Sequence, residues 1–168
     1  MERTSLTTRT LVFTVLSILC IVVLEPAHAQ KTGGTPPIGV SASQDLPAGA
    51  VFGECAFPVR FELNGKAATI TLPGGRFIFT SPGLNATLTN LNDLTKSVTL
   101  NITGAFHQST DRNGDTVTVV TGRNLLGDPD AGFVLAIGSF SFKFDASGNL
   151  VQPLAGTGQL IKVCPLIS

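Results

Sequence analysis

Apolar and polar side chains alternate at every second position in several stretches after residue 50. Val59, Phe61 and Leu63 are separated by Arg60 and Glu62, and the same alternation recurs at residues 69–72, 98–103, 116–119 and 139–145. Side chains on a β-strand point to opposite faces in turn, so each stretch predicts a strand with one face on a core and one in water. Residues 133–137 are apolar at every position, which predicts an inner strand packed on both faces.

The alternating stretches are separated by turn sequences. Asn64-Gly65 and Asn113-Gly114 each stand between alternating runs, and Asn-Gly favours the tight turn of a β-hairpin. Residues 73–75, 81–83 and 146–149 are also rich in turn-forming residues. The sequence therefore predicts an all-β fold: an antiparallel β-sandwich of Greek-key or immunoglobulin-like topology, with a small β-barrel as the alternative. A long connection at residues 125–130 favours Greek-key crossings over a plain meander.

Residues 1–29 predict a secretory signal peptide. Arg3 and Arg9 give a basic start, residues 11–24 are mostly apolar, and Ala27 and Ala29 are the small residues that signal peptidase accepts. The alternative is an N-terminal signal anchor in the membrane. A helix over residues 11–24 would be about 21 Å long against a hydrocarbon core of about 30 Å, so we expect cleavage after Ala29 and secretion.

The mature chain, which would begin at Gln30, has a size suited to one domain. Residues 30–50 are rich in Gly, Pro and Ser and predict a flexible lead, and residues 51–168 predict a single β-domain. Cys55 and Cys164 remain after cleavage, and export leads to an oxidising compartment, so we expect them to form a disulfide.

Charge limits the classes of partner. The chain has eleven basic and eleven acidic residues, for a net charge of zero, and the basic residues of the mature part are scattered singly. Such a surface does not neutralise a phosphate backbone or seek an anionic membrane, so we expect no nucleic-acid partner and no membrane association once the leader is removed. A partner in the cell envelope or the extracellular medium is compatible with this balance.

His107 is the only histidine after the leader, and it is the one candidate for nucleophilic catalysis. A hydrolytic triad needs a nucleophile and an oriented base beside the histidine, and a Gly-x-Ser-x-Gly elbow is absent. Ser109, two residues away, has no marked carboxylate partner. We therefore expect His107 to be a solvent-facing strand residue.

Two acidic loops are candidates for calcium. Asp111, Asn113 and Asp115 place oxygen ligands at alternate positions, as at the start of a calcium loop, but Gly is missing from the sixth position and Glu from the twelfth. Asp128 and Asp130 form the second loop. Either could hold calcium if folding brought them together, and the competing interpretation is a hairpin turn whose Asp side chains bond the local backbone.

Carboxylate pairs and aromatic platforms for carbohydrate chemistry are not indicated. Glu54 adjoins Cys55 and Glu62 lies in an alternating stretch, so both suggest structural roles. The chain has no Trp and no Tyr, and most of its eleven Phe residues fall on the apolar face of predicted strands. No phosphate-binding loop or zinc set is present in the sequence, so we expect no cofactor.

Residues 55–59, 86–90, 96–104, 114–116 and 119–126 together resemble exported β-domains of actinobacteria that have no assigned activity. The resemblance covers nearly the whole mature chain. It implies a bacterial, extracytoplasmic setting and assigns no role to any residue.

These observations predict a secreted, non-enzymatic β-domain with a binding or structural role at the cell exterior. The alternative is a small β-barrel that carries, or acts on, an apolar small molecule. The fully apolar residues 133–137 and the many phenylalanines motivate this second hypothesis.

Overall fold

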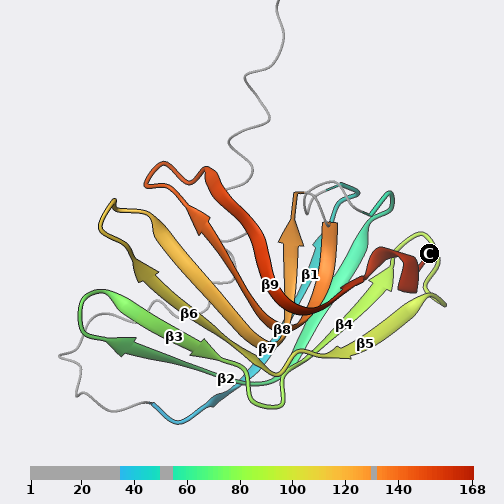
Figure 1. Cartoon of the computed structure of the whole chain (residues 1–168). Helices are drawn as coiled ribbons and strands as arrows, with labels where there is room; N and C mark the ends of the chain where they lie inside the picture. Colours follow the sequence, from blue (N-terminus) through green and yellow to red (C-terminus); the bar gives the residue numbers. More distant parts are fainter. Residues whose placement is uncertain (1–34, 50–54, 130–131) are drawn as a thin grey trace, which may run out of the picture. The chain divides into compact units, whose positions relative to one another are not determined.

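The computed structural model describes residues 35–49, 55–129 and 132–168. These residues form nine β-strands and one short 3-10 helix (Figure 1). The elements are β1 (Ile38–Leu46), β2 (Val59–Leu72), β3 (Arg76–Thr80), β4 (Asn85–Asn90), β5 (Ser97–Asn101), β6 (Gly104–Thr110), β7 (Thr116–Asp128), β8 (Gly132–Phe144), β9 (Leu150–Lys162) and η2 (Cys164–Leu166).

All the strands belong to one open antiparallel sheet. Its order is β5-β4-β2-β3-β6-β7-β8-β9, and β1 pairs with β2 beside this path. The all-β, antiparallel fold class is confirmed, and the sheet is consistent with a sandwich-like fold. The barrel alternative is not formed by the described residues, because β9 pairs with β8 alone and β1 with β2 alone.

The sheet has two parts that share the long strand β2. The first half of β2 pairs with β1 and β4, and the second half pairs with β3. β3 and β4 therefore lie end to end along β2. β6 pairs with β3 and β5 pairs with β4, so β6 and β5 also lie end to end. Ser81, just after β3, contacts the backbone where β5 ends and β6 begins. Its Oγ donates to the carbonyl of Ile102 at 2.7 Å and accepts from the N–H of Gly104 at 3.1 Å.

A row of four glycines crosses the second part of the sheet. Gly104 of β6 is opposite Gly122 of β7, which is opposite Gly138 of β8, which is opposite Gly158 of β9. Gly122 has a φ of 83°, and a Cβ there would lie 2.9 Å from the carbonyl oxygen of Thr103. The neighbouring backbones can approach this closely only because no side chain intervenes.

The main core lies between the first part of the sheet and the ends of β7 and β8 that adjoin each other in sequence, namely the last residues of β7 and the first residues of β8. Leu63 of β2, Leu88 of β4 and Leu100 of β5 belong to the same buried cluster as Phe133 and Leu135 of β8. A smaller cluster on the second part of the sheet contains Val120, Leu126, Val134, Ala136 and Phe140. Residues 133–137 contribute to both clusters, which confirms the prediction of an inner strand packed on both faces.

A disulfide joins the two ends of the domain. Cys55, just before β2, pairs with Cys164, just after β9, with their Cα atoms 5.3 Å apart across 109 residues of sequence. Both cysteines are buried in the main core. The amide of Asn90 donates to the carbonyl of Ile167 at 3.1 Å, so the chain after β9 is also held against the end of β4.

Three sequence predictions are corrected. The flexible lead expected at residues 30–50 is wrong for Ile38–Leu46, which form β1 along β2. The hairpin expected at Asn64-Gly65 is wrong, because β2 continues through both residues and pairs there with β1. The long connection expected at residues 125–130 is wrong up to Asp128, because β7 extends to that residue and β6 to β9 follow each other as a meander.

The physical reasons are nonlocal. Residues 38–46 alternate in exposure as a half-buried strand, and pairing with β2 overrides their Ser- and Gly-rich composition. Gly65 serves a close approach: a Cβ there would lie 2.6 Å from the Cα of Leu84. By contrast, Asn113-Gly114 does form the predicted turn between β6 and β7, where Gly114 has a φ of 87°.

Candidate functional site

The first part of the sheet carries an exposed polar surface opposite the main core. We name this surface the outer polar face. It comprises twelve side chains, three from each of four strands: Ser41, Ser43 and Asp45 of β1; Arg60, Glu62 and Asn64 of β2; Asn85, Thr87 and Thr89 of β4; Ser97, Thr99 and Asn101 of β5. Alternation puts these residues outside because their sequence neighbours, such as Leu63, Ala86 and Leu88, are buried.

Strand register aligns these side chains into three rows. One row is Ser41, Asn64, Asn85 and Asn101, and the next is Ser43, Glu62, Thr87 and Thr99. The third row is Asp45, Arg60, Thr89 and Ser97. Neighbouring strands lie about 4.8 Å apart and successive rows about 7 Å apart, so the surface is a regular grid of hydrogen-bonding groups.

Cross-strand hydrogen bonds fix part of this grid. The hydroxyls of Thr87 and Thr99 are 2.9 Å apart, and those of Thr89 and Ser97 are 3.0 Å apart. A threonine on a strand has few χ1 rotamers, and a hydrogen bond restrains the hydroxyl further. The β4–β5 side of the face is therefore pre-ordered before any partner arrives, which lowers the entropy cost of binding.

Charge on the outer polar face is nearly balanced. Arg60 binds Asp45 through two hydrogen bonds, of 2.8 Å from Nε and 3.0 Å from a terminal nitrogen. The hydrogen bond from Arg60 holds the pKa of Asp45 below its usual value. Both side chains are about half exposed, so the pair adds little stability and acts mainly to order the end of the face.

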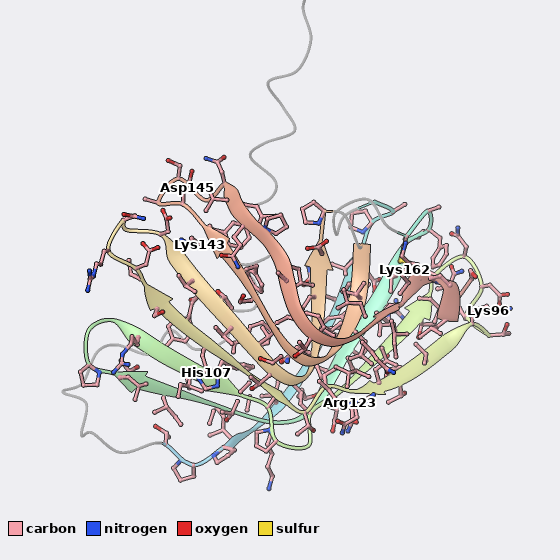
Figure 2. The ribbon with its side chains drawn as sticks, viewed as in Figure 1. Lys96, His107, Arg123, Lys143, Asp145 and Lys162 are labelled. Carbon is pink, nitrogen blue, oxygen red and sulfur yellow. A yellow bond between two sulfur atoms is a disulfide. The ribbon has the colours of Figure 1, made fainter. Side chains whose placement is uncertain are left out.

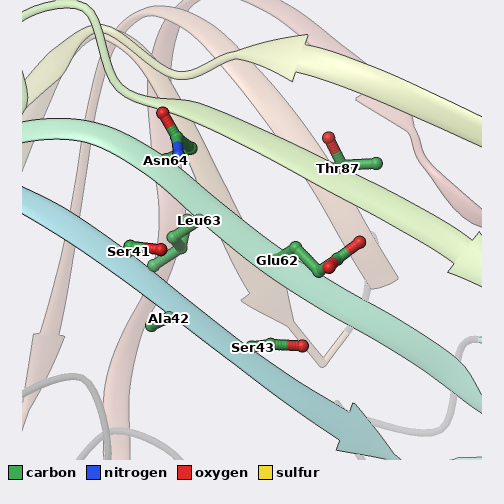
Figure 3. A pocket seen from close by; sticks show the side chains of 7 residues that line it. All are labelled: Ser41, Ala42, Ser43, Glu62, Leu63, Asn64 and Thr87. Atoms are coloured by element: carbon green, nitrogen blue, oxygen red, sulfur yellow. The ribbon is translucent and has the colours of Figure 1, made fainter.

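A hollow with a volume of about 340 Å³ lies on the face between β1, β2 and β4 (Figure 3). The side chains of Ser41, Ser43, Asn64 and Thr87 surround it, and Glu62 supplies a carboxylate. The hollow is open and sits on the polar surface rather than inside the core. Its size is at the lower end of small-ligand sites, which span roughly 300–1,000 Å³.

The comparisons with known proteins give no name to this surface. No protein-family model, no curated protein and no solved structure matches the chain. The chemistry of the site therefore rests on its own residues.

His107 lies exposed on β6, as the sequence predicts (Figure 2). Its cross-strand neighbours are Ile78 of β3 and Val119 of β7, both apolar, so neither adjacent strand brings a carboxylate opposite the imidazole. Ser109 points to the same face, but side chains two apart on a strand are separated by about 7 Å, beyond hydrogen-bond reach. The pair does not form a nucleophile and base. Of the two glutamates that follow the predicted leader, Glu54 lies outside the described residues and Glu62 is exposed on β2.

The turn at residues 111–115 is built by Asp111. Its Oδ1 accepts the backbone N–H groups of Asn113 at 2.8 Å and Asp115 at 3.1 Å, and its Oδ2 accepts a hydrogen bond of 2.9 Å from Nζ of Lys143. Lys143 also lies 3.5 Å from Asp115. The hydrogen bond from Lys143 is the main reason that the pKa of Asp111 lies below its usual value. This is the local bonding that the hairpin interpretation predicts.

The turn between β8 and β9 repeats this construction. Asp145 Oδ1 accepts the N–H groups of Ser147 at 2.9 Å and Asn149 at 2.8 Å, and its Oδ2 accepts from the amide of Asn149 at 2.8 Å. Figure 2 shows Asp145 and Lys143 near the same end of β8. Two adjacent hairpins of the meander thus end in the same Asp-x-x-Gly turn, which sequence inspection did not single out as a repeat.

The two acidic loops are not brought together. Asp115 precedes β7 and Asp128 ends it, so about 40 Å of extended strand separates them. Asp128 is buried at the β7–β8 end, and Asp130 lies outside the described residues. Within residues 35–49, 55–129 and 132–168, no group of three or more His, Cys, Asp or Glu side chains is arranged to hold a metal ion.

The outer polar face was not recognised as a unit from the sequence. Each strand shows its polar half in the alternation, but the rows align residues up to 60 positions apart, such as Ser41 and Asn101, through two intervening strands. The excess of Ser, Thr and Asn at alternate positions was the available signal. Within the part of the chain described, no helix is long and apolar enough to cross a membrane, and the predicted leader lies outside that part.

Proposed function

We propose that this protein is a non-enzymatic, secreted domain that binds a polar, uncharged partner at the cell exterior through its outer polar face. The partner is a macromolecule of the envelope or the surrounding medium that presents hydroxyl and amide groups. The observation that carries the proposal is the register of the three polar rows, which places exposed donors and acceptors on a rigid grid.

The chemistry of the rows supports this kind of partner. Ser and Thr hydroxyls and Asn amides both donate and accept, so they match surfaces of mixed polarity. The one close ion pair on the face, Arg60 with Asp45, is internally neutralised. The face offers neither the clustered positive charge that a polyanion needs nor an aromatic platform.

Export supports the proposed location. Residues 1–29 have the features of a cleaved leader, and the resemblance to exported actinobacterial domains points to the same setting. A disulfide between Cys55 and Cys164 is a stabiliser that persists in an oxidising space and is rarely kept in the cytosol.

Binding to the insoluble envelope of the producing cell tests the proposal. The exported protein is mixed with washed envelope, and the bound fraction is measured by sedimentation over a concentration series. The double variant Ser43→Arg/Thr99→Arg adds two bulky charges to one row. It should weaken binding about tenfold or more, because each lost hydrogen bond costs about 0.5–1.5 kcal/mol and the two long side chains would cover the neighbouring hydroxyl groups.

A matched control separates the face from general charge. The double variant Thr110→Arg/Ser139→Arg places the same two charges on exposed positions of the inner strands β6 and β8. It should bind as the wild type does. Equal loss in both variants, or turnover of esters, peptides or glycans that disappears in His107→Ala, would overturn the proposal.

A row of phenylalanines favours a second candidate function, the carriage of an apolar small molecule. Phe79 of β3, Phe106 of β6, Val120 of β7 and Phe140 of β8 lie opposite one another in register. The rings of Phe79 and Phe106 meet edge to face with centroids 6.3 Å apart, and both side chains are only partly buried. Val120 and Phe140 are buried, so the partly exposed rings of Phe79 and Phe106 are the surface on which an apolar molecule would be sheltered from water.

An uncharged naphthylamine dye tests this second candidate. Phe79→Ala should weaken dye binding about threefold to tenfold, because an aromatic contact contributes about 0.5–1.5 kcal/mol beyond its buried area. Ile78→Ala, the next residue along β3, points to the opposite face and is the control. No increase in dye fluorescence with the wild-type protein would exclude the carrier function.

A further inference from the structure

Strand β9 is an unprotected edge of the sheet. Among the described residues it pairs only with β8, and the six consecutive residues from Ala155 to Leu160 are all exposed. An edge strand presents a line of unpaired N–H and C=O groups, which is a template for pairing with another strand. Proteins commonly guard such an edge with charged side chains, very short strands or a covering group.

Two other edges of this sheet, β5 and β1, carry such guards. β5 is only five residues long, and Nε of Arg123 donates to the carbonyl of Asn101 at 2.9 Å, which occupies an acceptor on its edge. β1 carries the charged side chain of Asp45, held by Arg60. These features oppose the addition of a further strand at β1 or β5.

β9 has thirteen residues and no charged side chain from Leu150 to Ile161. It also carries two of the large apolar side chains that the described residues leave exposed, Val151 at 50% and Leu160 at 41%. Pro153 and the irregular register beside it protect the end of β9 near Leu150, so the edge open to pairing begins at Leu154. From Leu154 to Ile161 the edge is uncharged and partly apolar, which leaves it open to pairing with another strand.

We propose that β9 pairs with β9 of a second copy of this chain, antiparallel and related by a two-fold axis at Thr157. This alignment places Leu154 of each copy opposite Leu160 of the other. Both residues lie on the sheet face of the smaller core cluster, since Leu154 packs against that cluster and Leu160 pairs with Ala136, one of its members.

Charge favours the same occupant. Because residues 150–161 are uncharged, the two copies bring no like charges into opposition, and Lys162 of each copy meets Gln152 of the other. The resulting contact is isologous, so it closes on itself and yields a dimer rather than a filament. The outer polar face belongs to the opposite end of the strand order, on β1, β2, β4 and β5, so the dimer would present two such faces.

Molar mass in solution tests the proposal. The exported protein, measured by light scattering during gel filtration over about 1–100 μM, should show twice the mass of one chain. Thr157→Lys brings two lysines together at the axis and should shift the protein to the single-chain mass. Thr110→Lys, at an exposed position of the inner strand β6, should stay dimeric.

Disulfide cross-linking through a new cysteine tests the same contact if Thr157→Lys does not fold. Thr157→Cys should form an intermolecular disulfide under mild oxidation, seen as a double-mass band on a non-reducing gel, and Thr110→Cys should not. A wild-type protein at single-chain mass throughout the concentration range would overturn the proposal. A dimer that survives Thr157→Lys, or that neither cysteine variant traps, would overturn it equally, because the contact would then lie elsewhere.

Discussion

Gly122 of β7 lies directly opposite Gly138 of β8, in the middle of the row that Gly104 and Gly158 complete. A Cβ at Gly138 would lie 2.8 Å from the Cα of Gly158, and one at Gly122 would lie 3.1 Å from the Cα of Gly104. Gly122 and Gly138 are thus each required by the backbone of a neighbouring strand as well as by their own positive φ angles. The row allows the backbones of β6, β7, β8 and β9 to approach one another closely at these four positions.

Gly122→Ala should destabilise the protein. Its φ of 83° is unfavourable for alanine, and the new methyl group would press on the carbonyl of Thr103. We expect a loss of about 1–3 kcal/mol and a fall in Tm of about 3 °C or more by circular dichroism. Gly39→Ala on β1 is the control, since nothing lies within 4 Å of its Cβ position, and its Tm should not fall. Equal Tm values for Gly122→Ala and the wild type would contradict the role of the row.

The disulfide should contribute strongly to stability. A loop of 109 residues constrains the unfolded chain, and the loop-closure model gives about 4–5 kcal/mol for a loop of this length. Cys55→Ser should therefore lower the Tm under oxidising conditions and should not respond to a reductant. The wild type should fall towards the Tm of the variant when reduced. A wild-type Tm that is unchanged by reduction would show that the bridge does not form in solution.

The contact between Asp111 and Lys143 should make stability depend on pH at both extremes. The hydrogen bond from Lys143 lowers the pKa of Asp111 from its ordinary value of 3.8, so this stabilisation is present above that value and is lost as pH falls through the folded-state pKa. The hydrogen bond that Lys143 donates to Asp111 raises the pKa of Lys143 above its ordinary value of 10.5. The stabilisation from the charged lysine is therefore present below that value and is lost as pH rises through the folded-state pKa.

Melting curves of Asp111→Asn and Asp111→Ala separate the two roles of this carboxylate. Asn keeps an oxygen for the N–H groups of Asn113 and Asp115 but loses the charge that holds Lys143. At pH 7 we expect the order of Tm to be wild type, then Asp111→Asn, then Asp111→Ala. The gap between the wild type and Asp111→Asn should narrow as the wild-type carboxylate is protonated. A gap that is constant down to about pH 2 would show that the ion pair adds nothing.

Export should leave Gln30 as the first residue. Intact-mass measurement of protein recovered from the culture medium should give the mass of residues 30–168. Ala29→Leu should impair processing, since the cleavage site needs a small residue there. Recovery of the wild-type chain only from membranes, with residues 1–29 attached, would support the signal-anchor alternative instead.

Local patterns predicted the strands better than their connections. Alternation identified the polar and apolar faces of β2, β5 and β8, and Asn113-Gly114 marked a real hairpin. On β7 the predicted faces are wrong, because Thr118 is buried and Val117 and Val119 are only partly buried. Asn64-Gly65 did not, because both sides of β2 are already paired at Asn64, with Ser41 of β1 and Asn85 of β4. A turn dipeptide reports what the chain can do locally, and long-range pairing decided what it does here.

The candidate site shows the same limit. The disulfide could be predicted from composition and the expected compartment, since only Cys55 and Cys164 follow the predicted leader. The outer polar face could not, because a one-residue change of register would turn the polar residues of a strand towards the core. The rows exist only once β1, β2, β4 and β5 are paired as observed.

Amide chemical-shift mapping of the isotope-labelled exported protein, titrated with solubilised envelope fragments of the producing cell, tests the binding surface most directly. We expect the shifted amides to cluster on β1, the first half of β2, β4 and β5, with the largest changes around Glu62 and Thr87 beside the hollow. Shifts confined to β3, β6 and the phenylalanine row, or no shifts at saturating fragment concentration, would contradict it.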